Sequence, residues 1–384
     1  MDILLMYWLD LLKFFKKPKI KPFSAWQIEL TTRCPINCKM CIRETADGWL
    51  FGDMMIEDFK KLTPYFKDVE TVILEGWGDS LLHKDFVEII RLVKAEGAQA
   101  GFVTSGSILS KDYISELINA GTDLIGFSLA GATSGTHNSI RVGSDLNGLL
   151  GHIQTFNQIK ADKRLQKPSL HVIYLVLKDN ISEIPRLPQL AKEIGIEDVV
   201  LTNLIHITNE WQEEQMVYNC DRGQVNSLNP RTLEPLNPYE DLIKEAEANA
   251  KELKITLRTH PLSPIDIAVC EEDPLRNLYI SVDGKVSPCV YLYPPLPSPF
   301  KRIYCGKEYT MNSLSFGDIF KESFDAIWNN LEYTKFRDCF TQREMMAREV
   351  YSLFADTAEL KKFEKAQLSE PPEPCRTCHK MLGV

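Results

Sequence analysis

The sequence of 384 residues lacks several features that assign a protein to a class at once. No apolar run approaches the roughly 20 residues that a membrane-spanning helix requires. A basic excess is also missing: the net charge is −9, which argues against nucleic acid as a partner, because phosphates are bound by basic faces. The ten cysteines are too few for a disulfide scaffold of this length, yet more than an inert core requires. Their spacing therefore matters more than their number.

The N-terminal segment, residues 1–22, is an apolar stretch followed by a basic linker. This order differs from that of a signal peptide, in which the basic residues come first. We expect a helix that ends at Pro18, because proline lacks an amide donor and restricts the residue before it. Such a helix packs on the protein itself or on a partner chain; the alternative is a peripheral membrane contact through residues 3–15.

Between residues 23 and 258 the pattern alternates between predicted strands and predicted helices. The strands cover 26–31, 69–75, 98–104, 123–129, 169–177 and 198–204, and the helices cover 56–66, 84–96, 110–119, 146–161, 184–194 and 238–253. Strand–helix units in series require parallel strands with right-handed crossovers. The predicted fold class is therefore α/β, a partial (β/α)6 TIM-like barrel, in which ligands bind at the carboxyl ends of the strands.

Two further segments depart from this alternation. The stretch 206–237 is rich in Asn, Glu and Pro, and it is either a lid or a surface insertion. Residues 259–384 indicate a small C-terminal α+β domain. Within it, Asp283-Gly284 is a strong turn signal between two strands in 277–286, and helices are expected over 323–331 and 342–365.

Three cysteines follow the first predicted strand at short spacing. Cys34, Cys38 and Cys41 lie in one short loop, so three thiolates can converge on one metal centre at little entropic cost. A tetrahedral zinc site would need a fourth protein ligand, whereas a [4Fe–4S] cluster with three protein ligands leaves one iron open. This spacing, at the end of the first strand of a βα series, resembles the signature of the radical S-adenosylmethionine (radical SAM) superfamily. Structural cysteines or zinc are the alternative.

The resemblance implies further contacts to S-adenosylmethionine (SAM), which fall in the cysteine motif or near strand ends. The residues concerned are Met40, Gly76, Gly78, Asp79, Ser105, Ser128 and Arg141. The two glycines and Asp79 match a segment that cradles the methionine amino group, Ser128 matches a serine near the ribose, and Arg141 matches an arginine that pairs with the carboxylate. Asp79-Ser80 replaces the family's Glu-Pro and Ser105 replaces its Asn, so this chain departs from the pattern at both places.

A second set of cysteines lies in the C-terminal region. Thirteen residues separate Cys270 from Gly284, and four residues separate Gly284 from Cys289. This spacing resembles the opening of the SPASM and twitch extensions, which carry auxiliary iron–sulfur clusters. Cys375 and Cys378 supply two further thiolates, and four thiolates hold one cluster. Because six residues follow Cys378, we expect the single-cluster twitch arrangement, with zinc as the alternative metal. Two other cysteines, Cys305 and Cys339, could each replace one of these ligands, and Cys220 is interpreted as a plain thiol.

Together these resemblances imply a cytoplasmic radical SAM enzyme with an auxiliary iron–sulfur cluster, which we expect to be a [4Fe–4S] cluster. A reductant such as flavodoxin or ferredoxin would supply an electron, SAM would yield a 5′-deoxyadenosyl radical, and this radical would abstract hydrogen from a peptide or small-molecule substrate. A net oxidation in peptide or protein maturation, or in cofactor or small-molecule biosynthesis, is expected. The alternative is a non-catalytic iron–sulfur protein that relays electrons at a membrane surface.

Overall fold

The computed structural model of the chain describes residues 21–220, 237–265, 267–353 and 368–384. The predicted N-terminal helix, with its membrane contact through residues 3–15, lies outside these residues and stays a prediction. The second half of the 206–237 stretch and the end of the helix expected over 342–365 also lie outside them. Within the described residues, no helix combines the length and the apolar character that crossing a membrane requires.

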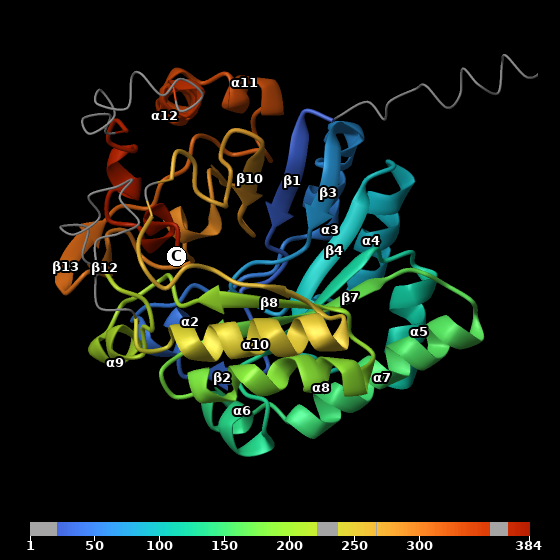
Figure 1. Ribbon diagram of the computed structural model, residues 1–384. Helices are drawn as coiled ribbons and strands as arrows, with labels where there is room; N and C mark the ends of the chain where they lie inside the picture. Colours follow the sequence, from blue (N-terminus) through green and yellow to red (C-terminus); the bar gives the residue numbers. More distant parts are fainter. Residues whose placement is uncertain (1–20, 221–236, 266, 354–367) are drawn as a thin grey trace, which may run out of the picture.

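A mostly parallel sheet forms the centre of the molecule (Figure 1). Its strands are β1 (Phe23–Ile28), β3 (Val69–Ile73), β4 (Gln99–Thr104), β5 (Leu124–Leu129), β7 (Ser169–Val176), β8 (Asp198–Asn203), β9 (Thr256–Arg258), β10 (Asn277–Ile280) and β11 (Val286–Ser287). They lie in the order β11-β10-β1-β3-β4-β5-β7-β8-β9, and only the β10–β11 pair is antiparallel. All six predicted strands form and follow one another in sequence order, so the predicted α/β partial barrel is confirmed.

Helices cover the outer face of this sheet (Figure 1). They are α3 (Ile56–Lys60), α4 (Phe86–Ala95), α5 (Lys111–Asn119), α6 (Ser134–Ile140), α7 (Leu146–Asp162), α8 (Leu187–Ile194) and α10 (Glu240–Leu253). Side chains cap the N-termini of two of these helices. The Ser110 side chain accepts a hydrogen bond from Tyr113 N at the start of α5, and the Asp145 side chain accepts one from Gly148 N at the start of α7. Two predicted helices are shorter than expected, because 3-10 turns that contain proline, Thr63–Asp68 and Ile181–Arg186, take part of each.

Alternating residues of each strand point to the helices or to the lumen. On the outer side the aromatic rings interlock, with centroids 5.8 Å apart for Phe127 and Phe156 and 5.0 Å apart for Phe86 and Phe102. Each such side chain contributes about 1.5–3 kcal/mol through burial. The inward positions remain half-buried and include polar residues such as Gln27. The stability of the barrel thus comes from its outer layer, which leaves the lumen free for ligands.

The C-terminal region is attached to one edge of the barrel sheet. The hairpin predicted over 277–286 is confirmed as β10 and β11, and β10 pairs in parallel with β1, so that Trp26 lies opposite Leu278. Further elements are β12 (Phe300–Tyr304), β13 (Lys307–Met311), α11 (Phe324–Trp328), α12 (Leu331–Leu353) and two 3-10 turns, Glu373–Cys375 and His379–Leu382. The boundary expected at residues 258/259 stays a prediction, because the sheet itself continues across it.

Candidate active site and metal centres

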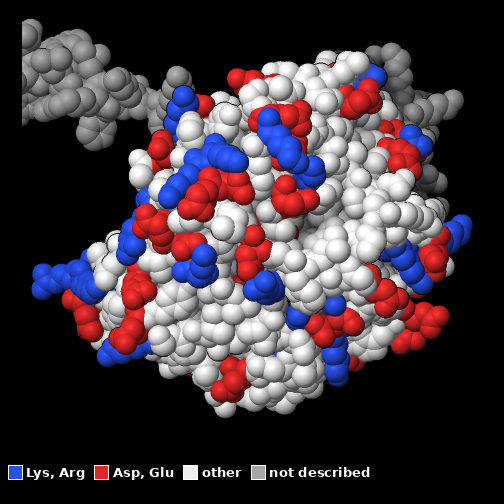
Figure 2. All heavy atoms as spheres, turned by 180° about the vertical axis from the view of Figure 1, so that it is seen from behind, with Lys and Arg blue, Asp and Glu red and all other residues white. Residues whose placement is uncertain are grey.

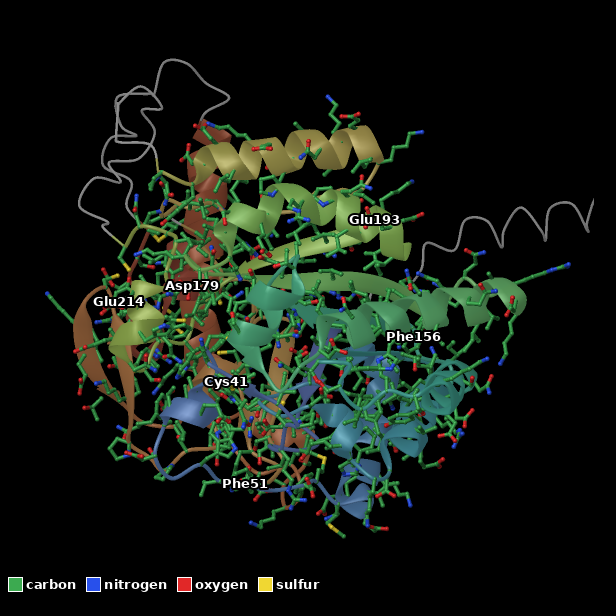
Figure 3. The ribbon with its side chains drawn as sticks, turned by 90° about the horizontal axis from the view of Figure 1, so that it is seen from below. Cys41, Phe51, Phe156, Asp179, Glu193 and Glu214 are labelled. Atoms are coloured by element: carbon green, nitrogen blue, oxygen red, sulfur yellow. The ribbon has the colours of Figure 1, made fainter. Side chains whose placement is uncertain are left out.

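The loop after β1 carries Cys34, Cys38 and Cys41 to the carboxyl end of the sheet. Cys38 lies in a two-residue strand, β2 (Asn37–Cys38), which pairs with β6 (Arg141–Val142). Cys41 directly precedes the short helix α2 (Ile42–Thr45), and its amide donates to Cys38 O at 3.0 Å. In Figure 3 Cys41 lies on the side of Glu214, away from Phe156 in the outer helix layer. The three predicted ligands are therefore brought together in one compact loop.

The three thiols also interact electrostatically. Burial raises the pKa of Cys34 to about 12 and the pKa of Cys41 to about 11, and the nearby sulfur of Cys38 adds to both shifts. Such thiols stay protonated at neutral pH unless a metal ion displaces the protons. The donor set, three thiolates in a partly buried loop, therefore fits an iron–sulfur cluster.

The glycine-rich segment after β3 packs directly on the cysteine loop. A Cβ atom on Gly78 would lie 2.3 Å from Thr31 O and 2.5 Å from Arg33 O, so only glycine allows this approach of the two backbones. The amide of Asp79 donates to Arg33 O at 2.8 Å and closes the contact. The predicted SAM segment and the predicted cluster loop thus form one rigid unit.

Glu29 makes a second connection between these two loops, which the sequence analysis missed. Its buried carboxylate accepts from Trp77 N at 2.7 Å and from the Tyr279 hydroxyl at 2.8 Å. Burial raises the pKa of Glu29 to about 7. A Cβ on Gly76 would lie 2.4 Å from this side chain. The one available signal was an acidic residue among the apolar residues at the end of a strand.

Asp79 and Ser105 lie at neighbouring strand ends and bind each other. The Asp79 carboxylate accepts from Ser105 Oγ at 2.7 Å, from Ser105 N at 3.0 Å and from Thr104 Oγ1 at 3.0 Å. It also accepts from Leu81 N at 3.2 Å. Its oxygens are therefore engaged by protein donors, and the residue holds the loops after β3 and β4 together.

Arg141 and Ser128, which stay predictions as SAM contacts, both lie near the carboxyl end of the sheet. Arg141 Nη1 lies 3.7 Å from Cys38 Sγ, and Arg141 Nε is buried with no hydrogen-bond partner among the described residues. An arginine donor in this state suits an anionic ligand such as a carboxylate. Ser128 is half-buried near the end of β5 and alternates with Phe127 and Leu129, which are buried. Its side chain accordingly lies on the lumen side of the strand.

Met40 is buried and serves the site through its backbone. The carbonyl of Met40 accepts from Gln212 Nε2 at 3.0 Å, and Gln212 is fully buried in α9 (Glu210–Glu214). Thr208 N and Thr208 Oγ1 donate to the amide oxygen of Gln212 at 2.7 and 3.0 Å, which fixes its orientation. The described half of the 206–237 stretch therefore supports the cysteine loop, a role that composition alone did not indicate.

The four predicted auxiliary ligands also converge. Burial raises the pKa of Cys270 to about 12 and raises the pKa values of Cys289 and Cys375 well above the usual range. The charge of Cys378 adds to all three shifts, which places the four thiols in one group. This donor set of four thiols, of which Cys375 is buried and the other three are partly buried, fits an iron–sulfur cluster.

The other three cysteines of the sequence lie outside this group. Cys339 on α12 donates its thiol to Glu370 O at 3.4 Å. Cys305, in the β12–β13 turn, faces Cys220, and its thiol donates to Cys220 O at 3.5 Å. The interpretation of Cys220 as a plain thiol was incomplete, because a contact between residues 85 positions apart leaves no trace in local spacing.

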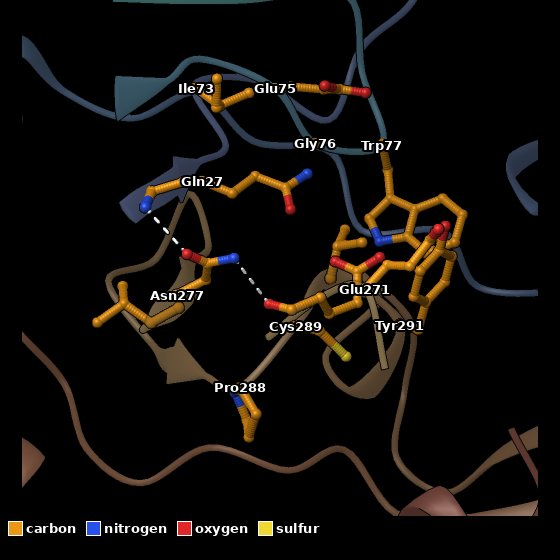
Figure 4. Close-up of a pocket in the computed structure, with 14 residues that line it drawn as sticks. Gln27, Ile73, Glu75, Gly76, Trp77, Glu271, Asn277, Pro288, Cys289 and Tyr291 are labelled. Carbon is orange, nitrogen blue, oxygen red and sulfur yellow. Dashed lines mark hydrogen bonds between the residues drawn. The ribbon is translucent and has the colours of Figure 1, made fainter. Parts of the chain in front are cut away.

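A cavity of about 350 Å³ lies between the carboxyl ends of barrel strands and the C-terminal region, next to Cys289 (Figure 4). Gln27, Glu75 and Trp77 line it from the barrel, and Glu272, Cys289 and Tyr291 line it from the C-terminal region. Trp77 contacts the rings of His206 and Tyr291, with centroids 5.3 and 6.2 Å away. The cavity thus has an aromatic wall and touches both the glycine-rich segment and one auxiliary ligand.

Two carboxyl groups in this cavity have raised pKa values. Burial raises the pKa of Glu75 to about 7, and the negative charges of Glu272 and Asp79 add to the shift. Burial also raises the pKa of Glu272, against the opposing charge of Lys380, whose Nζ lies 3.7 Å away. A carboxyl group that titrates near neutral pH is a candidate proton acceptor. Neither residue was singled out from the sequence.

Two family models match most of the chain. The radical SAM superfamily matches residues 28–217, and the iron–sulfur cluster-binding domain called SPASM matches residues 270–379. The chain belongs to the radical SAM superfamily. Radical SAM proteins require a [4Fe–4S] cluster and SAM, and SPASM domains bind auxiliary iron–sulfur clusters. The cofactors predicted from the sequence are thereby confirmed, and the cysteine sets described above fit them.

Relatives of this radical SAM protein extend over most of its length. The tungsten-containing aldehyde ferredoxin oxidoreductase cofactor-modifying protein of Pyrococcus furiosus is 26% identical over 318 residues, which are 81% of this chain and 82% of that protein. The AdoMet-dependent heme synthase of Methanosarcina barkeri is 23% identical over 325 residues, 82% of this chain and 84% of that protein.

Solved structures of radical SAM proteins share the fold. Streptococcus suis SuiB bound to S-adenosylmethionine has a TM-score of 0.57 and 13% identity, and covers 87% of this chain and 72% of its own. Native anSMEcpe with bound AdoMet has a TM-score of 0.54 and 13% identity, and covers 81% of this chain and 82% of its own. At such identities the likeness concerns the fold alone.

Proposed function

We propose that this protein is a radical SAM oxidoreductase that carries out a net two-electron oxidation of a substrate held between its two iron–sulfur sites. The observation that carries the proposal is the cavity of about 350 Å³, whose wall includes Gly76 and Trp77 on one side and Cys289 on the other. A substrate in this position would lie next to both the SAM segment and the auxiliary site.

The residues of the barrel divide the work of holding the first cluster and SAM. Cys34, Cys38 and Cys41 would supply thiolates to the cluster, and Arg141 would bind the SAM carboxylate with its guanidinium, whose Nε is buried. Gly76 and Gly78 would offer backbone to the amino group. When bound, these cofactors supply a 5′-deoxyadenosyl radical for hydrogen abstraction, with an auxiliary cluster as electron acceptor.

The cavity residues would position the substrate and take up a proton. Trp77 and Tyr291 provide an aromatic wall that excludes water and so protects a reactive species. An oxidation that removes a hydrogen atom and an electron also releases a proton in most products, such as a carbonyl or an alkene. The carboxylate of Glu75, with its pKa raised to about 7, is placed to accept that proton.

The auxiliary site would take part in electron transfer rather than in substrate binding. Cys270, Cys289, Cys375 and Cys378 supply four thiolates, so no coordination position remains open for substrate. Cys289 lines the cavity, which keeps the path from the substrate short. This ligand set also supports the single-cluster arrangement that the sequence predicts.

Peptides and cofactor precursors are the substrate classes that the relatives suggest. The Pyrococcus furiosus relative is named as a cofactor-modifying protein, and a PqqA peptide cyclase of Bradyrhizobium diazoefficiens is 22% identical over 178 residues. SuiB has been solved with its precursor peptide SuiA.

A flavodoxin or a ferredoxin would serve as the reductant. On the face shown in Figure 2, Lys and Arg side chains intermingle with Asp and Glu.

The first experiment is anaerobic incubation of the reconstituted protein with SAM and dithionite. We expect 5′-deoxyadenosine from the wild-type protein and none from the Cys34→Ala/Cys38→Ala/Cys41→Ala variant, which should also lose about four of about eight irons. Cys339→Ala is the matched control, because its thiol lies outside both cysteine sets. If the iron-loaded wild-type protein leaves SAM intact, the enzyme hypothesis is wrong and the electron relay is favoured.

A further inference from the structure

Three side chains outside both iron–sulfur sites form a compact group of donors. Among the described residues, Cys220, Cys305 and His379 are the one set of three His, Cys, Asp or Glu residues whose donor atoms all lie within 4.8 Å of one another. Ligands around a single zinc ion stand about 3.8 Å apart when Zn–S bonds of about 2.3 Å point to the corners of a tetrahedron. Cysteines that hold a [4Fe–4S] cube stand further apart, because each binds a different iron. The close spacing therefore suits one metal ion.

His379 is oriented as a metal ligand would be. It is 1% exposed, and its Nδ1 lies 3.1 Å from Ile205 O. A carbonyl oxygen can only accept, so Nδ1 carries the proton and Nε2 carries the lone pair. Nε2 is buried and has no hydrogen-bond partner among the described residues. Histidines that bind metals commonly donate their other ring nitrogen to a backbone carbonyl in this way.

Cys305 occupies a backbone conformation that disfavours its side chain. It forms, with Gly306, the two-residue turn between β12 and β13, and both residues have positive φ angles, 50° and 76°. Asn, Asp or Gly is the usual residue at the first position of such a turn. A cysteine there costs conformational energy, which is typical of residues retained for the position of their side chain.

Aromatic side chains enclose the group of donors. The rings of Tyr218 and Tyr304 contact His379, with centroids 5.7 and 4.9 Å away, and shield the group from solvent.

We propose that Cys220, Cys305 and His379 form a site for a single thiophilic divalent cation, zinc by preference, with water as the fourth ligand. Two thiolates and one imidazole are a donor set that zinc accepts in tetrahedral geometry. The cation would fasten the turn of the β12–β13 hairpin to the C-terminal tail that carries Cys378. It would thereby hold this auxiliary cluster ligand in place without binding the cluster itself.

The test is metal analysis of the full-length protein, purified without oxygen from cells grown with zinc and iron. We expect about one zinc per chain in addition to the iron. Cys220→Ser and Cys305→Ser should each lose the zinc and retain the iron, whereas Cys339→Ser should retain both metals. Zinc-edge X-ray absorption of the wild-type protein needs no variant and should show two sulfurs at about 2.3 Å and one nitrogen at about 2.0 Å.

Three outcomes would overturn the proposal. The first is a wild-type protein that contains no zinc and in which peptide mass spectra show a disulfide between Cys220 and Cys305. The pair would then be a disulfide and not part of a metal site. Zinc surrounded by four sulfurs would place it at the auxiliary cysteines instead. Loss of iron rather than zinc in Cys305→Ser would make Cys305 a ligand of the iron–sulfur cluster.

Discussion

Ser105 donates to Asp79 twice, from its hydroxyl at 2.7 Å and from its amide at 3.0 Å, and so joins the loops after β3 and β4. At both residues this chain departs from the family pattern that the sequence analysis compared it with, and the two departing side chains contact each other. Asp79 is held by protein donors on both oxygens, so we assign it a positioning role for the glycine-rich segment.

A double-mutant cycle on Asp79 and Ser105 should detect this coupling. Asp79→Asn removes a charged acceptor from four buried donors and should cost about 1–3 kcal/mol, and Ser105→Ala should cost about 1 kcal/mol. The double variant should cost about 1 kcal/mol less than the sum. The measurement is anaerobic thermal denaturation, in which 1 kcal/mol corresponds to about 2–4 °C. Ser107→Ala, at an exposed position of the same loop, is the control and should leave the stability unchanged. If the stability losses of the Asp79 and Ser105 variants are strictly additive, the positioning role of Asp79 is contradicted.

A second prediction concerns the backbone contact at Gly78. Gly78→Ala would place a Cβ 2.3 Å from Thr31 O, and backbone cannot yield as a flexible side chain can. We expect a loss of more than about 3 kcal/mol of stability, together with loss of the iron held by the adjacent cysteine loop. The control is Gly151→Ala in α7, where a Cβ meets nothing within 4 Å and alanine should stabilise the helix by up to about 1 kcal/mol. Normal iron content and SAM binding in Gly78→Ala would contradict the prediction.

The parts of the molecule that the sequence predicted are the parts set by local pattern. The strand order and the position of Cys34, Cys38 and Cys41 at a strand end follow from the alternation of strands and helices and from short spacing. Parallel strands with right-handed crossovers leave few other arrangements. The predicted hairpin at Asp283-Gly284 formed for the same reason, because the turn residues determine it locally.

The contacts that the sequence did not predict join residues far apart in the chain. Glu29 and Tyr279 are 250 positions apart, and Gln212 and Met40 are 172 positions apart. Spacing and periodicity report only on neighbours along one helix or strand, so they cannot indicate such partners. The pairing of Cys220 with Cys305 belongs to the same class. The site was thus predictable at its motif and not at its supporting contacts.

A third prediction concerns the guanidinium beside Cys38. Arg141→Lys keeps the charge but loses the planar fork that matches a carboxylate. We expect the dissociation constant for SAM to rise about 10- to 100-fold, because a charge-assisted hydrogen bond worth about 1.5–3 kcal/mol is lost. The iron content should stay unchanged. Arg33→Lys is the control, since Arg33 directly precedes Cys34 in the cysteine loop but its side chain is 58% exposed and pairs with Asp53. Unchanged SAM affinity in Arg141→Lys would remove this residue from the SAM site.

A fourth prediction follows from the raised pKa of Glu75. At pH values below its pKa of about 7, the Glu75 carboxyl group is protonated and cannot accept a proton. Product formation should therefore rise as the pH increases through about 7. Glu75→Gln should lose this pH dependence and form product about 10²- to 10⁴-fold more slowly. The measurement is product and 5′-deoxyadenosine formed at each pH, once a substrate is known. Glu96→Gln, exposed in the outer helix layer, is the matched control. An unaltered pH profile in Glu75→Gln would assign the proton to another group.

The last prediction separates the two possible roles of the auxiliary cysteines. If the cluster held by Cys270, Cys289, Cys375 and Cys378 accepts the second electron, then Cys375→Ala/Cys378→Ala should still cleave SAM but should form no oxidised product. If the cluster only fastens the C-terminal tail, a folded variant should form as much product per SAM cleaved as the wild-type protein.

Iron content must be measured first and should fall by about four per chain. Zinc should be measured as well, because His379 adjoins Cys378, and a variant that has lost both metals would report on tail docking rather than on electron transfer. Cys339→Ala provides the comparison, because it removes a thiol and leaves these four ligands and the proposed zinc ligands intact. Oxidised product at the wild-type ratio in an iron-depleted, folded Cys375→Ala/Cys378→Ala protein would refute electron acceptance by this cluster.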